Sequence, residues 1–246
     1  MQPRQAKHVV VDSFDFKPGR VLAGKYEVVS KLGGGWEGEV YLIRERATGI
    51  ERTAKLFFPQ RNPRDRAAKF YAKKLHILRQ CPIVIQYLTQ DSVVYRGTPV
   101  TFLISEFVEG ELLSEFLRRQ PGHRLSPFQA LHLLHALASG IECIHQMGEY
   151  HGDLHTDNII VQRYGLGFEL KLLDMFHWGK PRLQHIHNDT VDLIHIFHEA
   201  LGGQARYAKQ PPEVKAICRG LKRSLILENF RTAGELRAYL ETMQWA

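Results

Sequence analysis

The sequence has few features of a secreted or membrane-spanning protein. Its cysteines are odd in number and widely spaced, so Cys81, Cys143 and Cys218 predict neither a disulfide framework nor a metal site. No apolar run approaches the roughly 18 to 20 residues that cross a bilayer, and the first residues lack the apolar core of a signal peptide. We therefore expect a cytoplasmic protein with three buried thiols and no membrane segment.

Positive charge is concentrated in one segment of the chain. The 246 residues carry a formal net charge of +7, and residues 51–80 hold nine Lys or Arg against two acids, so the remainder is balanced. A basic chain can indicate nucleic-acid binding, but here the excess lies in one block, and no nucleic-acid partner is expected. With 44% hydrophobic and 24% charged residues, the composition is that of an ordinary globular protein.

Hydrophobic periodicity divides the chain into a β-rich first part and a helical second part. Alternation around glycines predicts strands over 25–58, and helical spacing predicts a helix over 63–80, followed by strands over 83–90 and 100–108. Beyond a short connection, further helices are expected over residues 112–117, 126–145, 190–200, 212–227 and 233–243. Ser126 is a good N-cap, with Pro127 at the first helical position.

A glycine-rich stretch, GGGWEG, follows a predicted strand at residues 33–38. Glycine lets a backbone turn sharply and approach a phosphate closely, because no Cβ intervenes. Strand residues follow the stretch, whereas a dinucleotide-binding fold would place a helix there. Alone, the pattern is equally compatible with a hairpin turn.

Three further positions carry candidate chemistry. Lys55 interrupts an apolar run, where a buried ammonium needs an anionic partner, although a surface lysine is the alternative. The segment EYHGDLHTDNIIV, residues 149–161, gathers polar groups before an apolar strand, which suits either a turn or a catalytic loop. Asp174 ends another apolar strand, a common position for a metal-binding carboxylate.

In order and spacing, these motifs resemble the signature set of protein kinases. Residues 16–243 are similar to the catalytic domain of bacterial eukaryotic-like (Hanks-type) Ser/Thr protein kinases. The resemblance implies an α+β, protein-kinase-like two-lobed fold: a five-stranded antiparallel sheet with one helix, then a mainly helical lobe with a shortened activation segment. The implied parts are an N-terminal extension, an N-lobe and a C-lobe, at residues 1–25, 26–108 and 109–246.

The resemblance also implies transfer of the γ-phosphoryl group of ATP to a Ser/Thr hydroxyl of a protein substrate, with Mg²⁺. Asp153 would orient the hydroxyl and accept its proton, and Lys55 would hold the α- and β-phosphates. Asn158 and Asp174 would hold the metal. The residues implied to bind ATP are Leu32, Gly33, Gly34, Gly35, Gly38, Val40, Ala54, Lys55, Glu106, Val108 and Ile160.

Several family positions hold other residues. No Glu occurs in residues 53–104, so the first-helix glutamate that pairs with the strand lysine is missing, and Lys74 stands in its register. Glu37 or Glu39 is the candidate substitute. Gly152 replaces the usual arginine of the catalytic loop, and the HGDLH form also resembles aminoglycoside-phosphotransferase-like kinases.

Three classes of function therefore stay open, of which we expect the protein Ser/Thr kinase. The missing glutamate favours a catalytically weak pseudokinase that acts as a nucleotide-sensing scaffold. A small-molecule kinase is favoured by HGDLH and by the fourteen residues between Asp174 and Asp189, which leave little room for peptide docking. The basic first-helix surface predicts an acidic partner, with an ordinary solvated helix face as the alternative.

Overall fold

The computed structural model describes residues 10–165, 167–175 and 179–244, which form two units that we describe separately. The first unit contains residues up to His76 and Gln86–Phe107, and the second contains Ile77–Ile85 and the residues from Val108 onward. The start of the expected N-terminal extension and Phe176, which follows the Asp174 motif, lie outside the described residues. Among the described residues, no helix is long and apolar enough to cross a membrane.

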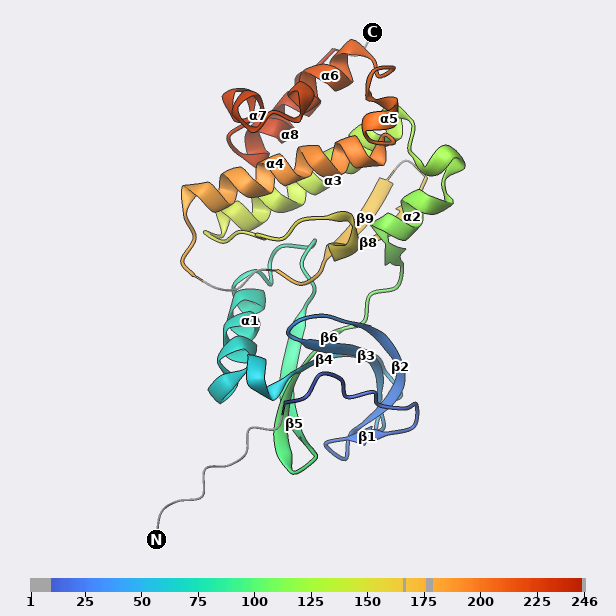
Figure 1. The fold of residues 1–246 in the computed structure, drawn as a ribbon, viewed down its shortest axis with the longest axis vertical. Coiled ribbons are helices and arrows are strands. Elements are labelled where there is room, and N and C mark those ends of the chain that lie inside the picture. Colours follow the sequence, from blue (N-terminus) through green and yellow to red (C-terminus); the bar gives the residue numbers. More distant parts are fainter. Residues whose placement is uncertain (1–9, 166, 176–178, 245–246) are drawn as a thin grey trace. The chain divides into compact units, whose positions relative to one another are not determined.

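The first unit is built on an antiparallel sheet of six strands in the order β1-β2-β3-β4-β6-β5 (Figure 1). The strands are β1 (Val21–Leu22), β2 (Tyr26–Gly34), β3 (Gly38–Glu45), β4 (Glu51–Phe57), β5 (Tyr87–Tyr95) and β6 (Thr98–Glu106). The sequence predicted five; the additional β1 has two residues, too few for a periodic pattern. One helix, α1 (Arg66–Ile77), follows β4, as predicted.

Residues before β2, which belong to the expected N-terminal extension, contribute to the core of the first unit. Phe14 and Phe16 are buried, and their rings contact those of Phe58 and Tyr41 respectively. Burial of such aromatic side chains is a major source of stability. The N-terminal segment is therefore an integral part of this unit.

A buried carboxylate on β3 anchors the same segment. Glu39 accepts hydrogen bonds from Ser13 Oγ at 2.7 Å, from the Phe14 backbone N–H at 3.1 Å, and from Tyr41 and Lys31. Burial alone would raise the pKa of Glu39, but these four donors lower it to about 2. The carboxylate is thus ionised, and two of its four donors, Ser13 and Phe14, tie the N-terminal segment to β3.

The second unit is mainly helical, as predicted, with a small three-stranded sheet (Figure 1). The strands, in the order β7-β8-β9, are β7 (Glu111–Leu112), β8 (Ile159–Tyr164) and β9 (Gly167–Leu172). The helices are α2 (Leu113–Arg119), α3 (Pro127–Gln146), α4 (Leu183–Ala200), α5 (Gln204–Tyr207), α6 (Pro212–Cys218), α7 (Arg223–Asn229) and α8 (Ala233–Thr242). The predicted helix 212–227 is two helices, because Arg219, Gly220 and Leu221 have positive φ angles.

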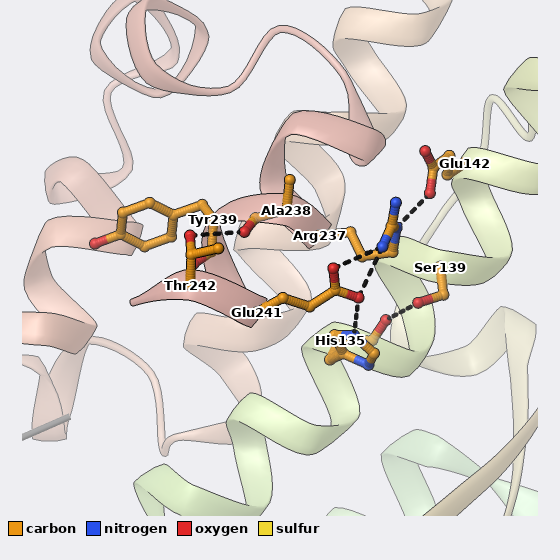
Figure 2. Close-up of polar contacts among 8 residues, drawn as sticks. All are labelled: His135, Ser139, Glu142, Arg237, Ala238, Tyr239, Glu241 and Thr242. Carbon is orange, nitrogen blue, oxygen red and sulfur yellow. Dashed lines mark hydrogen bonds and ion pairs between the residues drawn. The ribbon is translucent and has the colours of Figure 1, made fainter. Parts of the chain in front are cut away.

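Helix α3 begins at the predicted cap and packs along α8. Ser126 Oγ accepts a hydrogen bond from the Gln129 backbone N–H at 3.3 Å, and the Gln129 side chain accepts one from the Ser126 N–H. Figure 2 shows the polar contacts between α3 and α8: Arg237 donates to Glu142 at 2.5 Å, and Glu241 lies 3.0 Å from His135. These contacts attach the last described helix to the central one.

The cysteines differ from the sequence prediction. Cys81 and Cys143 form a disulfide within the second unit, across 62 residues of sequence, whereas Cys218 is a buried free thiol. The wide spacing concealed the pair because residues 77–85 fold back onto this unit, where the Leu172 N–H donates to Ile83 O at 2.8 Å. Burial raises the pKa of Cys218 to about 12, so that thiol alone fits the expected inert role.

Candidate functional site

The glycine-rich turn between β2 and β3 has open space in which a ligand could bind. A Cβ on Gly38 would lie 1.9 Å from Leu56 O, so the close approach of β3 and β4 requires glycine there. Cβ atoms on Gly33 and Gly35 would have nothing within 4 Å. The fold does not require glycine at these two positions, where the bare backbone is open to a ligand.

Contacts with the segment after β4 hold this turn in place. The Phe58 N–H donates to Glu37 O at 2.8 Å, and the Arg61 guanidinium lies 4.2 Å from the centre of the Trp36 ring. Trp36 itself is 63% exposed. The turn is therefore attached through its backbone, with an aromatic ring and a cation at its tip.

The predicted lysine has an anionic partner in the turn. Lys55 Nζ lies 3.4 Å from a carboxylate oxygen of Glu37, and both side chains are mostly buried. The Tyr71 ring of α1 lies 4.6 Å from the same ammonium. Of the two candidate substitutes for the missing glutamate, Glu37 thus makes the contact. Glu39 is committed to the N-terminal segment, and Lys74, in the glutamate register, is buried on α1.

The structure corrects the prediction that Ala54 binds ATP. Ala54 is fully buried in the core with Tyr41, the residue opposite it on β3. Successive strand residues point to opposite faces, so Ala54 faces away from Lys55. Thr53 shares the face of Lys55 and is partly exposed. The alternation of the strand was the signal that could have identified Thr53 in the sequence.

The remaining predicted residues of the first unit lie along the sheet, from this turn to Glu106, which pairs with Arg52 at the far end of β4. Leu32 is 48% exposed on β2, and Val40 is paired with Lys55 across β3 and β4. The Glu106 backbone N–H, at the end of β6, donates to Gln86 O at 3.0 Å. The first unit therefore gathers Leu32, Gly33, Gly34, Gly35, Gly38, Val40, Lys55 and Glu106, with Thr53 in place of Ala54.

In the second unit, a buried aspartate of α4 holds the loop before β8. The two carboxylate oxygens of Asp189 accept the backbone N–H groups of His151 and Gly152, both at 2.8 Å. His145 of α3 donates to the same carboxylate, with its Nε2 at 3.0 Å. Charge-assisted hydrogen bonds of this kind are strong, so the Asp189 carboxylate fixes the backbone conformation of the loop.

His151 connects this loop to the strand that ends at Asp174. Its Nε2 lies 3.0 Å from Leu173 O, and its Nδ1 accepts from the Asp153 N–H. This pattern requires the neutral imidazole with its proton on Nε2. His151 is fully buried, so its role is structural, as the sequence suggested. It places Asp153 and the residue before Asp174 in one hydrogen-bonded array.

The loop brings together two of the predicted side chains, those of Asp153 and Asn158. The Asn158 amide nitrogen lies 2.9 Å from Asp153 O, 3.2 Å from an Asp153 carboxylate oxygen and 2.8 Å from His155 Nε2. These contacts turn the Asn158 amide oxygen the other way. The Leu173 N–H donates to Asn158 O at 2.8 Å, which ties Asn158 to the residue before Asp174. The Asp153 side chain is 59% exposed.

Two residues near this loop were not singled out from the sequence. His155 lies 3.8 Å from the Asp153 carboxylate. Asp192, one turn after Asp189, has a pKa raised to about 6 by burial and by the negative charge of Asp189. The spacing of Asp189 and Asp192 places both on one face of α4, which was the available signal. Val108 and Ile160, predicted to bind ATP, are both partly exposed in this unit.

The two units together carry the residues of a kinase-type phosphotransferase: a glycine-rich turn, a paired strand lysine, and a loop with a carboxylate and an amide. The model of the protein kinase domain matches residues 26–188, and the chain belongs to this family. The family resemblance predicted from the sequence is confirmed. As a family, protein kinases use ATP and Mg²⁺.

Similar proteins agree with this assignment. Serine/threonine-protein kinase pkn2 of Myxococcus xanthus is 30% identical over 156 residues, 63% of this chain and 18% of that protein. Cyclin-dependent kinase B2-2 of Arabidopsis thaliana is 26% identical over 204 residues, 80% of this chain and 64% of that protein. The chain thus spans less than two thirds of the length of these relatives.

A solved structure confirms the fold. The kinase domain of Mycobacterium tuberculosis PknI superimposes with a TM-score of 0.63 at 18% sequence identity, covering 93% of this chain and 97% of that one. The α+β protein-kinase-like fold expected from the sequence is therefore established.

Proposed function

We propose that the chain transfers the γ-phosphoryl group of ATP to a Ser or Thr hydroxyl of a protein, with Mg²⁺. Membership of the protein kinase family and similarity to serine/threonine-protein kinases support this reaction. The proposed nucleotide-binding surface of the first unit is the glycine-rich turn with Val40, Thr53, Lys55 and Glu106. In the second unit, Val108 and Ile160 are the residues proposed to contact the nucleotide.

Asp153 is the proposed acceptor of the substrate proton. The hydroxyl oxygen attacks the γ-phosphorus, the bond from that phosphorus to the bridging oxygen breaks, and ADP leaves. The proton passes to the Asp153 carboxylate. The loop suits this role because its backbone is held by Asp189 while the Asp153 side chain is largely exposed. Such positioning is the main requirement of phosphoryl transfer.

Asn158 and Asp174 are the proposed ligands of Mg²⁺. The Asn158 amide nitrogen is occupied by Asp153 and His155, so its oxygen faces away from them, and Asp174 adds a carboxylate. Oxygen donors of this kind fit Mg²⁺, which is bound by one or two carboxylates together with substrate phosphates. When bound, the ion neutralises negative charge on those phosphates.

The hydrogen-bonded loop around Asp153 is the observation that carries the proposal, and one pair of variants tests it. Asp153→Asn keeps the size of the side chain but removes its basicity. We expect transfer from labelled Mg·ATP to fall by roughly 100-fold or more, while the thermal midpoint and ATP binding stay near wild type. Asp157→Asn is the matched control, because Asp157 is an exposed carboxylate of the same loop.

The outcomes separate the alternative functions. Wild-type transfer by Asp153→Asn would contradict the role of Asp153. ATP binding without any transfer by the wild-type chain would instead favour a nucleotide-sensing scaffold. Transfer to small hydroxyl compounds but not to proteins would favour a small-molecule kinase.

The proposal extends to the compartment and the partner. We place the domain in the cytoplasm, where ATP is available. Its proposed partner is a protein substrate. The nine Lys and Arg side chains in residues 51–80 favour an acidic protein.

A further inference from the structure

A hollow of about 520 Å³ lies on the outer face of α1 in the first unit. Its lining residues are Pro63, Arg64, Arg66, Lys69, Phe70 and Lys73, which we call the basic groove. The volume falls within the range of sites that hold a ligand or an anchoring side chain. All of these residues belong to α1 or to the turn before it.

The helical spacing explains why these side chains share a face. Arg66, Lys69, Phe70 and Lys73 lie at intervals of three and four residues and are all exposed. Ala67, Ala68 and Tyr71 point the other way and are buried. The groove is thus the outward stripe of a helix that is held on its opposite face.

Acids are scarce in the sequence around the groove. Asp65 is the one acid in residues 52–90. Its carboxylate accepts hydrogen bonds from Thr101 at 2.6 Å and from the Asn62 side chain at 3.3 Å, within the unit. The four cations of the groove belong to the block of residues 51–80, whose excess of positive charge equals the net charge of the whole chain, and they create a local positive potential.

Phe70 gives the groove an apolar centre. It is 44% exposed among the cations, with the Arg66 guanidinium 5.8 Å from the centre of its ring. An exposed aromatic side chain within a charged rim is the usual composition of a protein-docking site.

We propose that the basic groove binds an acidic segment of the protein substrate that carries one large apolar side chain. The acids of that segment would pair with Arg64, Lys69 and Lys73, and its apolar side chain would pack on Phe70. A nucleic acid or an anionic membrane would present charge over a wider area than this groove covers. The inference rests on the proposed function for the identity of the partner, but the binding itself does not depend on catalysis.

The test is direct binding of a fluorescent peptide made of Glu and Asp around one central Phe, measured by anisotropy with the full chain. We expect saturable binding that weakens at least tenfold from about 50 mM to about 500 mM salt, as the Debye length shortens. Phe70→Ala should weaken it by roughly tenfold, whereas Phe128→Ala, which removes an equally exposed aromatic side chain of α3, should not.

A charge-matched pair of variants completes the test. The triple variant Arg64→Glu, Lys69→Glu and Lys73→Glu should abolish binding. The triple variant Lys209→Glu, Lys222→Glu and Arg231→Glu changes net charge equally at exposed sites of the second unit and should bind like wild type. Equal loss in both triple variants, or equal binding of the peptide with Phe replaced by Ser, would overturn the proposal. So would tighter binding of anionic vesicles or single-stranded DNA than of the peptide.

The two proposals fail in different ways. Phosphoryl transfer without peptide binding would refute the groove and leave the proposed function standing. Peptide binding without any phosphoryl transfer would leave the groove standing and refute the proposed function.

Discussion

At the scale of single residues, the counter-charge of the strand lysine lies in a turn and not on the first helix. The lysine of the strand usually pairs with a glutamate of the first helix, whereas here Lys55 meets Glu37 of the glycine-rich turn at 3.4 Å. The ammonium needs a counter-charge because it lies beside Tyr71 with little exposure to water. The missing helix glutamate is therefore not an argument for loss of activity.

Two glycines of the turn are expected to differ in role, with Gly38 needed for folding and Gly35 for nucleotide binding. Gly38→Ala should lower the free energy of unfolding by several kcal/mol, because its Cβ would lie 1.9 Å from Leu56 O. Gly35→Ala should leave stability within about 1 kcal/mol, because nothing lies within 4 Å. It should nevertheless weaken ATP binding several-fold.

Urea unfolding and nucleotide titration of both variants make this comparison. Equal ATP affinity of Gly35→Ala and wild type would mean that the open space at Gly35 does not receive the nucleotide. A stable Gly38→Ala protein would contradict the close packing of β3 and β4.

At the scale of elements, α4 holds the loop that carries Asp153. Both carboxylate oxygens of Asp189 accept hydrogen bonds from the loop backbone. Asp192, one turn later, is a second acid on the same face of α4. Burial and the charge of Asp189 raise the pKa of Asp192 from 3.8 to about 6, with Asp153 acting in the same direction. Ionisation of Asp192 in the folded protein therefore carries an electrostatic cost.

This cost predicts a dependence of stability on pH. Since the folded-state pKa of Asp192 is raised, its protonated form favours folding below about pH 4. That contribution is lost as the pH rises through about 6. Asp192→Asn should therefore match wild type at pH 4 and be more stable at pH 8 by about 1 kcal/mol, allowing for solvent screening.

Thermal unfolding at the two pH values measures this effect, with Asp157→Asn as the control at an exposed position. A difference between wild type and Asp192→Asn that is the same at both pH values would show that Asp192 does not titrate as described.

At the scale of the whole molecule, the order of elements and the spacing of motifs were sufficient to predict the family and the fold. Ser126 identified the start of α3 because a capping residue acts locally. The same spacing predicts the site residues of both units, and their roles stay predictions. The prediction for Ala54 was wrong, because alternate strand residues point to opposite faces and Ala54 packs in the core.

Features that depend on distant contacts could not be predicted. The Cys81–Cys143 bond forms because residues 77–85 return to the second unit, which no local pattern indicates. The sequence could not distinguish Glu37 from Glu39 as the partner of Lys55. Glu39 accepts hydrogen bonds from Ser13 and Phe14, which are distant from it in sequence. Helix α4 begins at Leu183 rather than at residue 190, since the polar stretch before Asp189 hides its first turns.

The central claim is that the chain is a kinase whose strand lysine is positioned by Glu37. The most direct measurement is transfer from labelled Mg·ATP by wild type, Glu37→Gln and Glu45→Gln, the last a control at the other end of β3. We expect wild type and Glu45→Gln to transfer equally and Glu37→Gln to lose at least about tenfold in kcat/KM, since the ammonium loses the carboxylate that lies 3.4 Å from it and helps to position it. Equal or faster transfer by Glu37→Gln, which would make Glu37 a blocking rather than a positioning residue, would contradict the account.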